Sequence, residues 1–340
     1  MLPFKSVLET MAWSSRTSTS RLVTGWLLRI SGLHSWAGSA VYCSIAIDVS
    51  SLRSPTRNFI DVDQNSPDWG WLRKTMELQR PVGIFDAGIG SYAIVERVRA
   101  AFPAQDIVYF ADRASFPYGA KTPQQLLASV QRATAYLQAQ GCVAVVLASN
   151  APSVVVLEPL RAAAGVPVIG IFPPVAEAVR RSASGKVAVL GVRSMVGSAA
   201  MQAYADVHRG DDEVVLVNAS ALVDLVENFA FVHRPQETQA AVSGFIAELR
   251  AAHPQVDVMT MSSTHLPWLK PFFEAAAPDV QFLDPADGVL QELAPHTSAG
   301  GGHTRCVATA SAELSLDDFN TALRALGTPL QAELVELAVD

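Results

Sequence analysis

The feature that most constrains the fold is a series of short, continuous apolar runs that begins at residue 82. The runs read VGIF (82–85), DIVYF (106–110), VAVVLA (143–148), VPVIGI (166–171), VAVLG (187–191), EVVLV (213–217), VDVMTM (256–261) and VQFLD (280–284). Between some of them lie stretches with apolar residues at helical spacing, such as SYAIVERVRAAF, TPQQLLASVQRATAYLQAQG and ALVDLVENFAFV. Continuous rather than alternating apolar strands are covered on both faces. We therefore expect an α/β fold with mainly parallel sheets.

The chain also repeats itself weakly. PVGIFDAGIG is similar to KVAVLGVRSMVG about a hundred residues later, and VAVVLASNAP is similar to VDVMTMSSTHLP. Each half thus has an opening strand with a glycine-containing turn and a later strand that ends in serine. Parallel sheets bind ligands outside the carboxyl ends of their strands. The repeat therefore predicts two similar α/β domains that face each other across a cleft.

Composition limits the partners and the redox chemistry. The 340-residue chain has a net charge of −7 and no cluster of Lys and Arg, which argues against a nucleic-acid partner. The three cysteines, Cys43, Cys142 and Cys306, are far apart and show no metal-ligand spacing. They are typical of reduced, buried thiols, so we expect no disulfide framework, no metal and a cytoplasmic location.

The first 76 residues differ from the rest. They hold five of the six tryptophans, and their apolar run is interrupted by Arg29 and His34, which makes it a poor membrane span. A transit-like segment is one interpretation, because arginine and serine are common there and acids are rare. A disordered or non-native extension is the favoured one, with Met76 as an alternative translation start. No membrane partner is expected.

Two motifs suggest chemistry that other features oppose. GIGSYA (88–93) follows a strand and fits a dinucleotide-binding turn, but no acid ends a second strand at the required distance, and Asp86 would repel a pyrophosphate. Ser149 or Ser263 with His265 could form a serine hydrolase site, although no GxSxG motif occurs. A hydrolase would also need a carboxylate that orients His265. The sequence cannot show that contact.

Taken together, the polar segments resemble the cofactor-independent glutamate racemases of the Asp/Glu racemase superfamily. IFDAGIGSYAIVERV looks like the family's opening FDSGxGG turn, and YFADRASFPYG matches its YFxDxxxxPYG segment closely. LASNAP stands where the family has ACNTA, MSSTHLP where it has GCTHYP, and LVDLVEN fits its LVxxVE helix. The resemblance covers about residues 81–330. It implies that the α-proton is removed on one face of the substrate and returned on the other, for D-glutamate supply to peptidoglycan.

The resemblance assigns roles to individual residues. Ser149 and Ser263 occupy the two acid/base positions, where the family has cysteine, and Asp86 and His265 would assist them, with Asp112 and Glu227 behind. The substrate-binding positions are Ala87, Tyr118, Gly119, Asn150, Ala151 and Thr264. Domain 1 would comprise about 77–174 and 283–340, and domain 2 about 175–282. No metal, pyridoxal phosphate or nucleotide is implied, and a homodimer is left open.

The two serines argue against fast racemisation. A free thiol ionises near pH 8.5, whereas a serine hydroxyl ionises several units higher, and each unit costs roughly 1.4 kcal/mol. Small hydroxyl donors are also missing at Ala87, Ala151, Val192 and Met195, so natural divergence explains the changes better than deliberate mutation. Three alternatives remain. They are an impaired racemase of glutamate or a related amino acid, a non-catalytic relative that binds a small anion or a protein in the same cleft, and a Ser/His enzyme of other chemistry.

Overall fold

The computed structural model describes residues 78–337, and the extension predicted for residues 1–76 lies outside this range. The described strands form two sheets in which every paired neighbour is parallel. The prediction of a parallel α/β fold is therefore confirmed. None of the helices in the described range is long and apolar enough to cross a bilayer.

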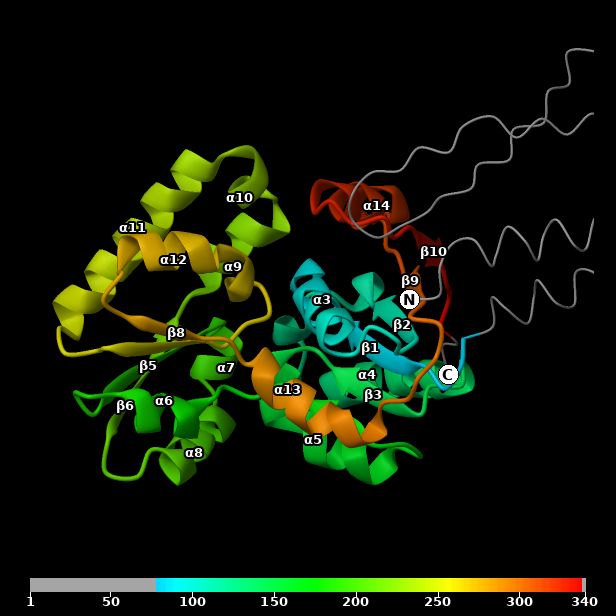
Figure 1. The fold of residues 1–340 in the computed structure, drawn as a ribbon, viewed down its shortest axis with the longest axis horizontal. Helices are drawn as coiled ribbons and strands as arrows, with labels where there is room; N and C mark the ends of the chain where they lie inside the picture. Colours follow the sequence, from blue (N-terminus) through cyan, green and yellow to red (C-terminus); the bar gives the residue numbers. More distant parts are fainter. Residues whose placement is uncertain (1–77, 338–340) are drawn as a thin grey trace, which may run out of the picture. The chain divides into compact units, whose positions relative to one another are not determined.

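The first sheet has six strands and the second has four (Figure 1). The order in the first is β10 (Ala332–Leu334), β9 (Thr304–Ala308), β2 (Ile107–Ala111), β1 (Val82–Asp86), β3 (Ala144–Leu147) and β4 (Val168–Gly170). The order in the second is β6 (Glu213–Asn218), β5 (Lys186–Gly191), β7 (Val258–Met261) and β8 (Gln281–Leu283). β1 lies between β2 and β3 just as β5 lies between β6 and β7. The weak sequence repeat thus corresponds to equivalent strands in the two sheets.

Helices cover both faces of each sheet. On the first sheet, α3 (Tyr92–Ala101), α13 (Ala286–Leu293) and α14 (Leu316–Ala325) share one core, whereas α4 (Pro123–Ala139) and α5 (Asn150–Ala163) pack in another. On the second sheet, α9 (Ser220–Glu227), α11 (Pro235–Ala252) and α12 (Lys270–Ala276) pack opposite α6 (Val175–Arg181) and α8 (Ala199–His208). Two one-turn helices, α7 (Arg193–Val196) and α10 (Ala230–His233), complete the second set. This two-sided cover explains the continuous apolar runs.

Local sequence explains where several helices begin and end. Thr122 Oγ1 accepts a hydrogen bond from the Gln125 N–H, and Gln125 Oε1 accepts one from the Thr122 N–H, so a capping box starts α4. The predicted helix ALVDLVENFAFV divides into α9 and α10 because Phe229 between them has a φ of 57°. This break places Glu227 at the carboxyl end of α9, next to the loop that follows β1.

Candidate active site

A cavity of about 530 Å³ lies outside the carboxyl ends of strands from both sheets. Its wall includes residues that follow β1, β3, β5 and β7, together with the segment 116–120 after β2. β1 and β5 are the strands at which the order of each sheet reverses, and such switch points are where open parallel sheets bind ligands. The topology thus directs both halves of the chain toward one site.

Most of the site residues predicted from the sequence line this cavity. They are Asp86, Ala87, Tyr118, Gly119, Ser149, Asn150, Ala151, Ser263, Thr264 and His265. Asp112 and Glu227 do not line it, and each contacts a residue that does. Ser149 follows a strand of the first sheet and Ser263 a strand of the second, so the two serines line the same cavity from different halves of the chain.

The Ser149 side of the cavity contains a buried carboxyl group. β1 and β3 are adjacent, which brings Asp86 at the end of one strand close to Ser149 after the other. Burial raises the pKa of Asp86 from 3.8 to about 6, although the charge of His265, the Ala87 N–H and the Ser149 hydroxyl oppose this shift. Asp86 therefore changes its protonation state close to neutral pH, as a proton-transfer group should.

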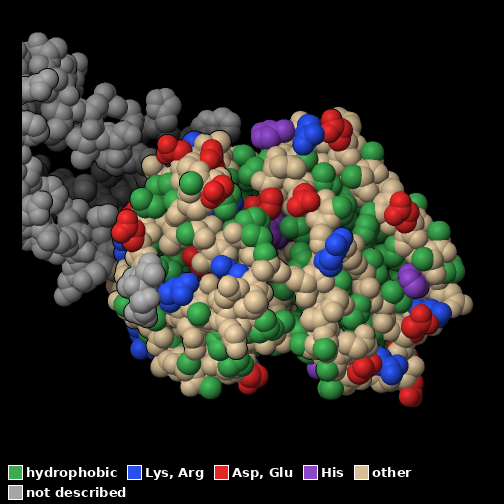
Figure 2. All heavy atoms as spheres, turned by 180° about the vertical axis from the view of Figure 1, so that it is seen from behind, with side chains coloured by type: hydrophobic (Ala, Val, Ile, Leu, Met, Phe, Trp, Pro, Cys, Tyr) green, Lys and Arg blue, Asp and Glu red, His purple; other side chains and the backbone are tan. Residues whose placement is uncertain are grey.

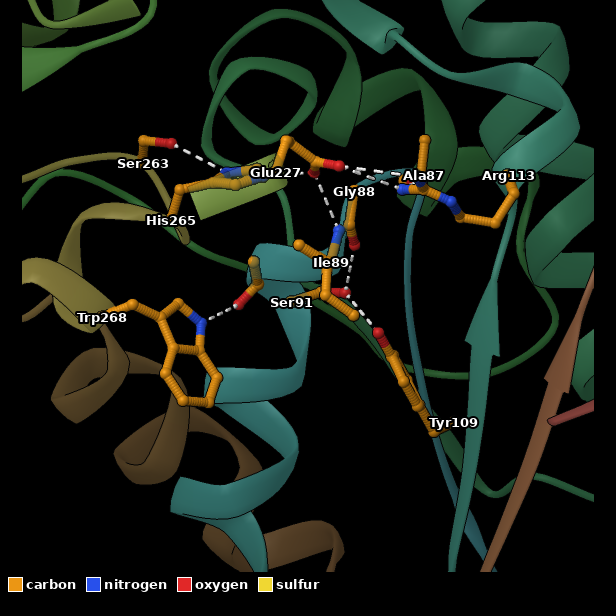
Figure 3. Close-up of polar contacts among 11 residues, drawn as sticks. Ala87, Gly88, Ile89, Ser91, Tyr109, Arg113, Glu227, Ser263, His265 and Trp268 are labelled. Atoms are coloured by element: carbon orange, nitrogen blue, oxygen red, sulfur yellow. Dashed lines mark hydrogen bonds and ion pairs between the residues drawn. The ribbon is translucent and has the colours of Figure 1, made fainter. Parts of the chain in front are cut away.

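The Ser263 side contains a chain of polar contacts (Figure 3). Ser263 Oγ lies 3.3 Å from His265 Nδ1, and His265 Nε2 lies 2.6 Å from Glu227 Oε1. Burial would raise the pKa of Glu227, but the hydrogen bond and charge of His265, with smaller effects of Arg113 and the Ile89 N–H, lower it from 4.5 to about 2. Glu227 is therefore ionised at neutral pH and supplies the carboxylate that orients His265.

Gly88 and Gly90 leave the space that the His265 ring occupies, because neither has a side chain. A Cβ atom on Gly88 would lie 2.9 Å from His265 Cε1, and one on Gly90 would lie 2.7 Å from the ring atoms Cγ and Nδ1. The imidazole from the second half of the chain thus lies directly against the turn after β1 (Figure 3). The glycines of the GIGSYA motif are explained by this close approach, without a bound dinucleotide.

Gly90→Ala should destabilise the protein by about 1–3 kcal/mol, because the new Cβ would also lie 2.8 Å from the His265 backbone nitrogen, which cannot move like a side-chain tip. The measurement is urea-induced unfolding followed by circular dichroism. Gly244→Ala in α11 is the control, because nothing lies within 4 Å of its Cβ position and alanine favours a helix by about 0.5–1 kcal/mol. Equal stability of the Gly90 variant and the wild type would contradict the close packing.

Asp112 acts through Tyr118. The Tyr118 hydroxyl donates to Asp112 Oδ2 at 2.9 Å, and the Thr309 hydroxyl donates to Oδ1 at 3.0 Å. Burial, with the neighbouring Asp112 charge, raises the pKa of Tyr118 well above 10, so this hydroxyl stays protonated as a donor. Asp112 therefore fixes the segment that carries Tyr118 and Gly119 at the cavity wall.

Asn150 lines the cavity and carries a buried side-chain acceptor without a partner among the described residues. Its side-chain nitrogen donates to the Ile171 carbonyl at 3.3 Å, whereas its Oδ1 atom is buried and has no hydrogen-bond partner among the described residues. A buried acceptor without a partner is costly, and a donor on a ligand would satisfy it. Asn150 and Asp86 both line the cavity, and an amide oxygen and a carboxyl group are acceptors to which an ammonium group can donate.

Arg113 is a site residue that the sequence analysis did not single out. Its guanidinium donates to the Ala87 carbonyl at 2.8 Å and lies 3.5 Å from Glu227 Oε2, so it joins the turn after β1 to the end of α9 (Figure 3). It lies inside the YFADRASFPYG segment, and this motif could have pointed to it.

Ser194 is a second site residue that the sequence motifs did not indicate. Its Oγ lies 2.6 Å from the position of a Cβ on Gly119, and this contact explains the glycine.

Comparison with known proteins places this geometry in a family. A family model described as Asp/Glu/Hydantoin racemase matches residues 92–293. The chain belongs to the Asp/Glu/Hydantoin racemase family. The resemblance expected from the sequence motifs is thereby confirmed. Among the described residues of this racemase family member, no group of three or more His, Cys, Asp or Glu side chains could hold a metal ion.

Individual relatives are glutamate racemases. That of Roseiflexus sp. (strain RS-1) is 33% identical over 217 residues, which are 63% of this chain and 78% of the relative. The solved glutamate racemase of Thermus thermophilus in complex with β-chloro-D-alanine is 27% identical, with a TM-score of 0.61 and coverage of 76% of this chain and 97% of that one. A glutamate racemase isoform of Bacillus anthracis shares the fold at 21% identity, with a TM-score of 0.66 and coverage of 77% and 99%.

Proposed function

We propose that this chain is a glutamate racemase-like protein that binds glutamate or a related amino acid in the cavity and racemises it slowly at most. The observation that carries the proposal is that Ser149 and Ser263, from the two sheets, line one cavity. In this assignment the substrate α-carbon lies between the two hydroxyls. The relatives of this chain suggest that its biological role is to supply D-glutamate for peptidoglycan. This reaction would take place in the cytoplasm.

The surrounding groups support an amino-acid ligand. Asn150 Oδ1, which has no partner among the described residues, and the carboxyl of Asp86 would receive the ammonium group. Thr264 and Gly119 would contact the rest of the amino-acid backbone, and Asp112 would hold Tyr118 and Gly119 in place. We assign the residues that surround the ligand to two domains. The first comprises about residues 77–174 and 283–340, and the second about residues 175–282.

The chemistry itself is limited by the hydroxyls. A base whose pKa lies far above the working pH contributes little to proton transfer. The proton of Ser263 has an acceptor in His265, and Ser149 lies beside the carboxyl of Asp86. In this assignment each helper group lies behind its serine and does not contact the α-carbon. We therefore expect binding to persist and two-base racemisation to be slow.

The test is a binding and exchange experiment with D- and L-glutamate in deuterated water. Titration calorimetry should detect binding, while NMR should show α-proton exchange close to the blank rate. Asn150→Leu should abolish binding because it removes the acceptor for the ammonium, whereas Ser243→Ala in α11, away from the cavity, should not. If the folded protein bound neither enantiomer, the proposal would be wrong. Binding without any exchange would identify the non-catalytic form of the cavity.

A further inference from the structure

The contacts of His265 define which of its nitrogens carries the proton whenever the ring is neutral. Ionised Glu227 places Oε1 2.6 Å from Nε2, and a carboxylate can only accept a hydrogen bond, so in the neutral form of the ring the proton lies on Nε2. Nδ1 is then left with its lone pair toward Ser263 Oγ, at 3.3 Å. The hydroxyl therefore donates to His265 and has a general base in direct contact.

This arrangement is held firmly in place. His265 is 7% exposed, and its ring lies against the turn that Gly88 and Gly90 keep free of side chains. Glu227 accepts from the Ile89 N–H at 3.0 Å and lies beside Arg113, which prevents the carboxylate from turning away. A nucleophile, a base and a third group that orients the base are the parts that activate a serine.

The two serines of the cavity differ in this respect. Ser263 contacts an imidazole, whereas Ser149 precedes α5 without a side-chain capping bond and lies beside the Asp86 carboxyl. A hydroxyl is a poor base toward a carbon acid, but a hydroxyl that transfers its proton to histidine is an effective nucleophile toward a carbonyl carbon. The change from thiol to hydroxyl thus disfavours racemisation and leaves nucleophilic chemistry open at Ser263.

We propose that Ser263, His265 and Glu227 form a nucleophilic triad that hydrolyses esters of small carboxylic acids in this cavity. A volume of about 530 Å³ accommodates a small acyl group and its leaving alcohol. In the described part of the chain, the backbone N–H groups of Ser263 and Thr264 donate to no acceptor, which leaves them free for the negative charge on the carbonyl oxygen. This activity does not depend on glutamate binding.

The reaction balances with ester and water alone. Ser263 Oγ bonds to the carbonyl carbon while its proton moves to His265 Nδ1, and the bond to the leaving oxygen then breaks as that oxygen takes the proton. Water next attacks the acyl-serine, giving a proton to Nδ1. The Oγ–carbon bond breaks, the acid leaves, and the proton returns to Oγ. Glu227 accepts from Nε2 throughout and stabilises the positive ring.

The experiment uses the full chain with p-nitrophenyl acetate as substrate and an alkyl fluorophosphonate as the covalent probe. We expect hydrolysis above the blank and mass spectrometry of digested protein to find the probe on Ser263. Ser263→Ala should lower hydrolysis by about 10²-fold or more and abolish labelling. Ser243→Ala on α11 should change neither, which makes it the matched serine control.

Glu227→Gln tests the positioning role. The neutral amide can turn its N–H₂ toward Nε2 and move the ring proton to Nδ1, so we expect labelling of Ser263 to slow by about 10-fold or more. Glu227→Asp should restore part of the rate, and thermal unfolding identifies any variant that fails to fold. The proposal is overturned if the folded wild type neither reacts with the probe nor hydrolyses the ester, or if Ser263→Ala leaves both unchanged. Glutamate α-proton exchange is measured separately by NMR. The ester hydrolysis proposed here and the proposed glutamate function can therefore fail independently of each other.

Discussion

Replacing both Ser149 and Ser263 with cysteine should raise the rate of glutamate α-proton exchange by about 10³-fold or more over the native chain. The reason is acidity, because a free thiol ionises near 8.5 and a polarised site lowers this value further, so a thiolate is accessible at neutral pH. General acid–base catalysis contributes about 10²–10⁴-fold per group. The measurement is loss of the α-proton signal in deuterated water, with D- and L-glutamate followed separately.

The single variants sharpen this prediction. In a two-base reaction each base removes the proton from one enantiomer, so Ser149→Cys and Ser263→Cys should each accelerate exchange of one enantiomer, and the two variants should favour opposite ones. Circular dichroism of the substrate solution should show full racemisation with the double variant alone. Acceleration of the same enantiomer by both single variants would contradict the placement of the serines on opposite sides of the α-carbon.

Two native thiols in the described part of the chain provide an internal control. Cys142 and Cys306 are buried, neither lines the cavity, and burial raises the pKa of both thiols to about 12. They should therefore contribute nothing to exchange, and Cys142→Ala in the double variant should leave the rate unchanged. If the double variant bound glutamate without exchanging its α-proton, the two serines would not occupy the acid/base positions.

Much of the fold could be predicted from the sequence, because a buried strand requires a run of consecutive apolar residues that is visible in the sequence itself. Each apolar run from 82 to 284 became a strand, and most of these strands are buried on both faces, whereas β6 at the edge of its sheet is only partly buried. β9 and β10 were not predicted. Cys306, Val307 and Ala308 make β9 a buried strand beside β2, but only three apolar residues mark it and a glycine-rich segment precedes it. β10 is an edge strand with two exposed residues, so it has no apolar run.

The site was less accessible from sequence, because its contacts join residues that are distant in the chain. Glu227 and His265 are 38 residues apart, and Glu227 and Ile89 are 138 apart. The motifs named these groups through family resemblance, but only the fold shows that Glu227 Oε1 reaches His265 Nε2. The roles of Gly88 and Gly90 also depend on the other half of the chain, which explains why GIGSYA could be mistaken for a dinucleotide motif.

Asp86→Asn should stabilise the protein at pH 7 by up to about 3 kcal/mol. At this pH the Asp86 carboxylate is ionised although it is buried, and the loss of its hydration lowers the free energy of unfolding. Asp86 is 4% exposed, and the pKa of its carboxyl is about 6 in the folded chain compared with 3.8 as its usual value. Below pH 3.8 it is protonated in both states and has no cost. Between pH 3.8 and 6 the unfolded chain ionises first, so stability falls as the pH rises, and above pH 6 the full cost is present.

Urea-induced unfolding from pH 4 to pH 7 measures this effect, and the wild type should lose stability across that interval relative to Asp86→Asn. Asp206→Asn in α8 is the control, because its exposed ion pair with Arg209 should be worth no more than about 1 kcal/mol. The same Asp86 variant in the double-cysteine background should lose most α-proton exchange, because a titrating group beside Ser149 is gone. Greater stability together with lower exchange would mean that Asp86 is kept for chemistry at a cost to folding. An Asp86→Asn protein that was less stable at pH 7 would instead mean that the ionised carboxylate is satisfied by its neighbours.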